Sequence, residues 1–84
     1  MMSEKEIGVI IKYYSKIGVA IIKLSSVIKT GDTIALKGAT TDFSQVVDSL
    51  QIDKESIQKA GAGKEVALKV KEKVRENDKV FLAK

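Results

Sequence analysis

Hydrophobic and polar residues alternate over several short segments of this 84-residue chain, with the period of a half-buried β-strand. The clearest case is the alternation of Val66, Leu68 and Val70 with charged or small residues. Other segments of similar length are rich in β-branched and aromatic residues, which favour strands. The pattern predicts six strands, over residues 6–14, 17–24, 33–38, 42–52, 64–70 and 79–83.

The first two predicted strands are joined by only a short turn, so we expect them to pair as an antiparallel hairpin. Strict alternation in the first strand would place Ile7, Val9, Ile11 and Tyr13 on one face. The fourth segment is less regular, because Phe43 is out of step with the apolar residues near its end. A β-bulge near residues 48–49 would reconcile the two registers.

Residues 28–36 and 74–82 have similar sequences, in which a polar turn leads into an apolar strand. Gly31 in the first copy corresponds to Asn77 in the second. Glycine and asparagine are the residues that best tolerate a positive φ angle. The repeat therefore predicts the same left-handed turn before the third and the sixth strand.

Asp53 is a plausible N-cap, and the residues after it predict one short helical turn near 54–60. Six short strands with polar turns favour an all-β, six-stranded antiparallel closed barrel, because closure protects the edges that an open sheet exposes. A chain of this length buries one core. We therefore expect a single domain over residues 1–84.

The chain contains no cysteine and no histidine, which excludes disulfides, zinc clusters, thiol nucleophiles and imidazole acid–base chemistry. The glycine-rich segment 61–64 resembles part of a phosphate-binding loop, but such a loop requires glycine at the position of Gln58 and serine or threonine at that of Glu65. We therefore interpret the segment as a link between elements. No pair of acidic residues has the spacing of a calcium loop. We therefore expect a protein that is not an enzyme, with no metal and no cofactor.

The start of the chain lacks the basic and apolar regions of a signal peptide, and the longest apolar stretch is interrupted by lysines. These features predict a cytoplasmic protein that makes no membrane contact. The formal net charge of +4 lies mostly in the first half of the chain. A basic surface fits a polyanion such as RNA, although lysine-rich faces also occur on proteins that bind none.

Tyr13 and Tyr14 are adjacent, so a strand would send one ring to the core and leave the other at the surface. A surface ring at Tyr14, flanked by Lys12 and Lys16, could stack on a nucleic-acid base. The alternative is a rim residue that closes the end of the barrel. Lys12, Tyr14 and Lys16 are thus one group of candidate binding residues.

The order and spacing of these elements resemble the β-barrel domain that follows the GTPase domain in translational GTPases of the elongation factor Tu and initiation factor type. The carriers are residues 17–20, 29–34, 47–52 and 74–78, together with Gly38, Ala60, Gly63 and Val66. The resemblance implies the same six-stranded barrel. It also places Gln51, Ile52 and Lys54 at the face that contacts tRNA in the family.

The chain has no GTPase domain of its own, so no GTP binding is expected. The first hypothesis is a non-catalytic, translation-factor-like barrel that contacts RNA, tRNA or the ribosome. The alternative is a module that docks on a separate GTPase or enzyme subunit. Either function would use the two groups of candidate residues given above.

Overall fold

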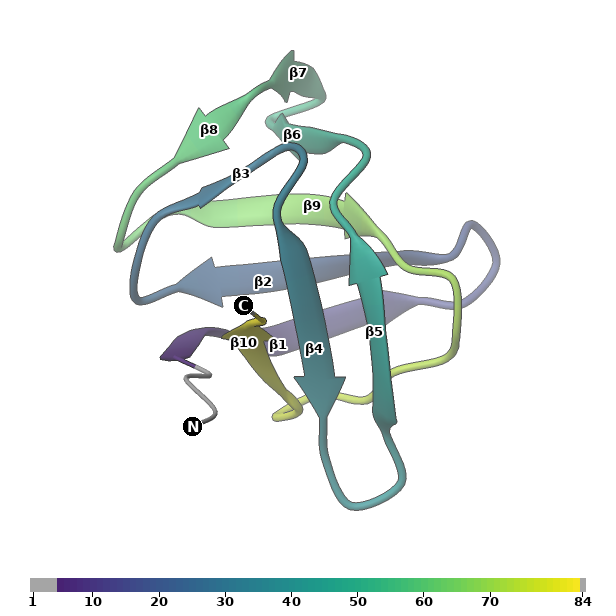
Figure 1. Cartoon of the computed structure of the whole chain (residues 1–84). Helices are drawn as coiled ribbons and strands as arrows, with labels where there is room; N and C mark the ends of the chain where they lie inside the picture. Colours follow the sequence, from purple (N-terminus) through teal and green to yellow (C-terminus); the bar gives the residue numbers. More distant parts are fainter. Residues whose placement is uncertain (1–4, 84) are drawn as a thin grey trace.

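The computed structural model describes residues 5–83, and all regular elements among them are β-strands. These residues form ten strands, whose arrangement can be followed in Figure 1. Their bounds are β1 Lys5–Tyr14, β2 Val19–Leu24, β3 Ile28–Lys29, β4 Thr33–Lys37, β5 Asp42–Val46, β6 Leu50–Ile52, β7 Glu55–Ile57, β8 Lys59–Ala60, β9 Glu65–Lys69 and β10 Lys79–Leu82. The described residues include no helix that could span a bilayer.

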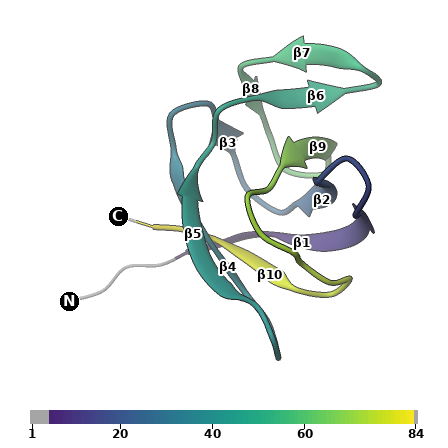
Figure 2. The same ribbon diagram turned by 90° about the vertical axis from the view of Figure 1, so that its right-hand side faces the viewer.

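The strands form an antiparallel sheet in the order β5-β4-β10-β1-β2-β9-β6-β7, with β3 and β8 paired separately. In Figure 1 the β4–β5 hairpin crosses β1, β2 and β9 at a steep angle, and Figure 2 shows how the sheet curls around the space between them. One apolar core fills this space. Its largest buried side chains are Ile7, Ile10, Ile22, Ile28, Ile34, Leu36, Leu50, Leu68, Val47, Val66, Val74 and Val80.

The all-β, antiparallel class is confirmed, whereas the closed six-stranded barrel is wrong. The strand order begins at β5 and ends at β7, so two edges remain open. The predicted fourth strand over residues 42–52 is two strands with different neighbours: β5 pairs with β4, and β6 pairs with β7 and β9. The irregular register of this segment therefore marks a break between strands and not a bulge within one.

The helical turn expected near residues 54–60 is also wrong. Asp53 and Lys54 both have positive φ angles, 51° and 68°, and form the two-residue turn of the β6–β7 hairpin. Such a turn matches the twist of the strands on either side of it. The residues that follow pair with β6 and β3, so their backbone groups are satisfied between strands and not within a helix.

The hairpin of β1 and β2 is confirmed, but the expected faces of β1 are not. The register of β1 shifts between Glu6 and Gly8 against β10, and between Ile10 and Lys12 against β2. These irregularities bury both Ile7 and Ile10, which strict alternation would separate, and leave Ile11 exposed. A bulge of this kind commonly redirects a side chain near a functional surface.

The repeated turn is confirmed in detail. Gly31 and Asn77 have φ angles of 92° and 76°. The Gly31 and Asn77 amides donate to the carbonyls of Val47 and Ile10, respectively. The amides of Val47 and Ile10 donate in return to the carbonyls of Asp32 and Asp78. Each copy of the repeat thus attaches a strand start to a distant segment of the chain by the same pair of bonds.

Candidate functional site

Three pockets with shared lining residues lie along the surface of β1, β2, β9, β6 and β5. The first, which we call the tyrosine pocket, has a volume of about 480 Å³ and lies between Tyr14 and Gln51. A smaller middle pocket shares Gln51 and Ala67 with it. The third, the glutamine pocket, shares Ser49 and Lys69 with the middle one and has a volume of about 470 Å³. The three pockets therefore follow one another from the β1–β2 hairpin to β5.

The irregularity in β1 shapes the tyrosine pocket. Ile11 and Tyr14 project outward there, with 39% and 44% of their surfaces exposed. The Lys12 ammonium lies 5.9 Å from the centre of the Tyr14 ring, within the range of a cation–π contact. Asp53 and Glu65 line the same pocket. The pocket thus combines exposed apolar surface with charges of both signs, which suits a protein partner.

The structure brings together three of the six predicted binding residues, because Lys12, Tyr14 and Gln51 all line the tyrosine pocket. Lys16 and Lys54 are exposed in the β1–β2 and β6–β7 turns and do not line it. Ile52 is half-buried and packs against the hydrophobic core. The two groups of candidates, separate in sequence, therefore meet through Lys12, Tyr14 and Gln51.

The turn beside this pocket holds two non-glycine residues in left-handed conformation. Asparagine and glycine are the usual residues of such a turn, so lysine at position 54 costs conformational energy. The segment keeps its geometry because β6 and β7 pair on both sides of the turn through Leu50 to Ile57. Backbone strain of this kind is often found at binding surfaces.

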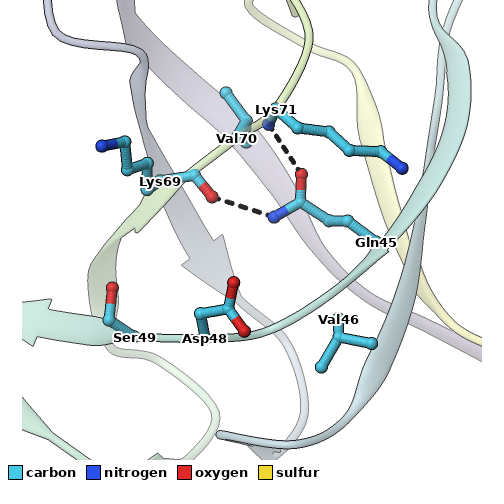
Figure 3. Close-up of a pocket in the computed structure, with 7 residues that line it drawn as sticks. All are labelled: Gln45, Val46, Asp48, Ser49, Lys69, Val70 and Lys71. Carbon is cyan, nitrogen blue, oxygen red and sulfur yellow. Dashed lines mark hydrogen bonds between the residues drawn. The ribbon is translucent and has the colours of Figure 1, made fainter.

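The glutamine pocket lies where β5, at one end of the sheet, faces the segment that follows β9. Figure 3 shows the Gln45 side chain reaching across this gap. Its Nε2 donates to the Lys69 carbonyl over 2.9 Å, and its Oε1 accepts from the Lys71 amide over 2.9 Å. We call this pair of bonds the Gln45 bridge. A side-chain amide thus connects two segments that a closed barrel would join by backbone pairing.

The sequence analysis missed Gln45, although the pattern contains a signal. Alternation places Gln45 on the same inward side of its segment as Phe43 and Val47, where an apolar residue is expected. A polar residue at such a position indicates a hydrogen bond to another segment of the chain, because polar side chains that turn away from solvent are usually paired. The partners come from a segment 24 and 26 residues away, which local pattern alone does not identify.

Among residues 5–83, no group of three or more carboxylates could hold a metal ion. Every buried side-chain nitrogen or oxygen of the described residues has a hydrogen-bond partner.

The sequence is similar to proteins that are named as proteases. It is 41% identical over 80 residues to an uncharacterized protease of Methanocaldococcus jannaschii, covering 94% of this chain and 20% of that protein. It is 36% identical over 77 residues to a collagenase of Porphyromonas gingivalis, covering 89% of this chain and 21% of that protein. The chain therefore spans about a fifth of the length of these relatives. No protein-family model matches it.

Solved structures show the same fold. The C-terminal domain of a putative U32 peptidase from Geobacillus thermoleovorans superposes with a TM-score of 0.85 at 19% identity, covering 90% of this chain and 89% of that chain. A selenomethionine variant of the same domain gives a TM-score of 0.86 at 20% identity, with 90% and 96% covered. The chain thus has the fold of a domain that forms the C-terminal part of a larger protein.

These comparisons correct the functional predictions. The resemblance to the translational GTPase barrel is wrong, because both the sequence relatives and the structural neighbours are named as peptidases. The translation and RNA-binding function that followed from it is wrong for the same reason. The prediction that the protein is not an enzyme is also overturned, since the relatives are named as a protease and a collagenase. Of the two hypotheses, the alternative of docking on an enzyme agrees better with these findings.

Proposed function

We propose that this chain serves as the C-terminal β domain of a U32-type peptidase and packs on the remainder of that enzyme. The observation that carries the proposal is the 41% identity to a named protease over 94% of the chain. A match over nearly the whole chain, but over only a fifth of the relative, is the relation of one domain to a multidomain protein. The shared fold with a U32 C-terminal domain supports the same relation.

The tyrosine pocket, together with the β1–β2 and β6–β7 turns, provides the contact surface in this proposal. Ile11, Tyr14 and Ile17 are exposed large apolar residues in β1 and the turn after it. Exposed apolar and aromatic residues are characteristic of interface centres, and charged residues of their rims. Lys12 and Gln51 supply polar groups at the pocket itself, and Ile52 supports β6 from the core side. Lys16 and Lys54 are exposed in the two neighbouring hairpin turns, where they would add charge to the rim.

The test uses the collagenase of P. gingivalis, in which the segment matched by this chain is either deleted or replaced by these 84 residues. We expect the deletion to reduce collagen cleavage and the replacement to restore it at least in part. A second form of the replacement carries Lys12→Ala and Tyr14→Ala, which removes the cation–π pair from the proposed interface. Cleavage by this form should fall back toward that of the deletion.

Val27→Ala provides the matched control, because Val27 is 51% exposed but lines none of the three pockets. Cleavage by the replacement should be unchanged with this substitution. Full collagen cleavage by the deletion would show that the segment has no part in the enzyme and would contradict the proposal. Equal losses from the control and from the double substitution would contradict the assigned surface.

A further inference from the structure

The gap between β5 and the segment after β9 is lined by backbone groups that no neighbouring strand within residues 5–83 binds. β5 pairs with β4 on one side and stands at the end of the strand order on the other. An edge strand directs alternate amides and carbonyls away from its sheet. Across the gap, the Lys69 carbonyl and the Lys71 amide face β5, and in the part of the chain that the structure describes both are bound by the Gln45 side chain.

The two hydrogen bonds of the Gln45 amide are those that the N–H and the C=O of one residue in a neighbouring parallel strand would make. One of its atoms donates to the carbonyl of residue 69 and another accepts from the amide of residue 71. An adjacent parallel strand pairs with residues i−1 and i+1 in the same way, around Val70 in this case. The side chain therefore satisfies the two groups that an added strand would need.

The side chains that line the glutamine pocket could contact those of an added strand. Val46 is 48% exposed at its edge and can contact an apolar side chain of a ligand. Lys69 and Lys71 line the pocket, against one acidic residue, Asp48. Opposite charges across an interface favour association and suppress wrong partners. The excess of positive charge favours acidic side chains in the ligand.

We propose that the gap at the Gln45 bridge is a binding site for an extended, acidic polypeptide segment, which adds as a strand between β5 and residues 69–71. On binding, the Gln45 amide leaves the Lys69 carbonyl and the Lys71 amide, and the backbone of the peptide replaces it. Strand addition obtains its affinity from main-chain hydrogen bonds and its specificity from alternate side chains. This proposal does not depend on the peptidase assignment, because it rests on the gap itself.

Gln45 competes with the ligand for the Lys69 carbonyl and the Lys71 amide. A binding site that is covered in most molecules has an apparent affinity reduced by the fraction that is open. Gln45→Ala removes the bridge and leaves the edge free. We therefore expect this variant to bind the peptide about three- to tenfold more tightly than the unaltered chain, since each replaced hydrogen bond has only a modest net strength.

The experiment titrates the 84-residue chain with a hexapeptide of alternating valine and glutamate while NMR records the backbone amides. We expect the amide signals of Val46, Lys69 and Lys71 to shift with increasing peptide. The matched control is the same peptide with alternate backbone nitrogens methylated, which keeps the side chains and removes half of the donors. This control should bind at least tenfold more weakly.

Two further variants test the charge preference. Lys71→Glu reverses a charge in the pocket and should weaken binding several-fold. Lys73→Glu makes the same change at a position that does not line the pocket and should have little effect. Absence of shifts at Val46, Lys69 and Lys71 in both the unaltered chain and Gln45→Ala would overturn the proposal. Equal binding of the methylated peptide, or self-association of the chain through this edge without peptide, would overturn it as well.

Discussion

Two side chains attach the β4–β5 hairpin to other parts of the molecule, and their surroundings differ. Asp78 is only 5% exposed, and its carboxylate accepts from the Thr41 hydroxyl in the hairpin loop and from the Arg75 amide over 2.9 Å. Gln45 is half-buried, neutral and beside an open pocket. We refer to the first contact as the Asp78 bridge. One end of the hairpin is thus held in the interior and the other at the surface.

Burial determines which of the two contacts a ligand can replace. Breaking the Asp78 bridge leaves a carboxylate in a site closed to water, and the cost includes its full desolvation. Breaking the Gln45 bridge exposes three polar groups to the solvent of an open pocket, where water can replace each lost bond. The Asp78 bridge therefore stabilises the fold permanently, whereas the Gln45 bridge can open for a ligand.

Asp78→Ala should have the largest effect on stability. It leaves the buried Thr41 hydroxyl and the Arg75 amide without their acceptor. We expect a loss of about 2–4 kcal/mol in the free energy of unfolding, since bonds to charged acceptors contribute most. Urea denaturation followed by circular dichroism measures it. A loss no larger than that of Gln45→Ala would remove the distinction between the two bridges.

Gly38→Ala should come next. A β-carbon at this position would lie 1.9 Å from Oδ1 of Asp78, so the carboxylate must move away from its partners. The expected destabilisation is about 1–3 kcal/mol, the usual cost of overpacking. In Asp78→Ala the same glycine substitution should cost much less, because the clashing carboxylate is absent. Denaturation of both single variants and the double variant provides this cycle, and strict additivity would contradict the close contact.

Asp32→Ala tests the counterpart of Asp78 in the repeated turn. The Asp32 carboxylate accepts from the Lys29 amide over 3.1 Å and pairs with the Lys29 ammonium over 2.7 Å. The turn is the same, but the ion pair is exposed on the lysine side, so we expect a loss of about 1 kcal/mol. Thermal denaturation at low and high salt should give nearly the same loss of stability, because the exposed ion pair contributes little to it. A loss equal to that of Asp78→Ala would show that the turn, and not burial, determines the cost.

Gln45→Ala should have the smallest effect. Both bonds of the Gln45 bridge are neutral and lie beside open solvent, so the expected loss is about 0.5–1 kcal/mol. The variant should unfold with an unchanged dependence on urea concentration. A loss above about 2 kcal/mol would place the Gln45 bridge among the permanent contacts of the fold.

Local sequence patterns predicted the parts of the fold that depend on neighbouring residues. Alternation identified most strands, and the likeness of residues 28–36 to 74–82 predicted two left-handed turns at Gly31 and Asn77. The helical turn was wrong because Asp53 can cap a helix or occupy a hairpin turn, and the pairing of β7 and β8 with distant strands decided between them. The bulges of β1 likewise depend on partners in β2 and β10.

The candidate site was predictable only in part. Lys12 and Tyr14 were selected for their chemistry and Gln51 through a family resemblance, and pairing of distant strands brings them to one pocket. That resemblance rested on the order of common turn and strand features, which many small β domains share, and both the family and the closed barrel that it implied are wrong. Gln45 was missed because its partners lie far away in the sequence.

Hydrogen exchange at two amides tests the distinction between the bridges most directly. The Arg75 amide donates to the carboxylate of Asp78, and the Lys71 amide donates to Oε1 of Gln45. Both residues are exposed, but the Arg75 amide donates to a buried acceptor, whereas the Lys71 amide donates to a half-buried one. Local opening of a contact sets the protection of the amide that it holds. We predict that, after correction for intrinsic rates, the Lys71 amide exchanges at least about tenfold faster than the Arg75 amide. Equal protection of both amides at the level of global unfolding would contradict the account, because the Gln45 bridge would then open only when the whole domain unfolds.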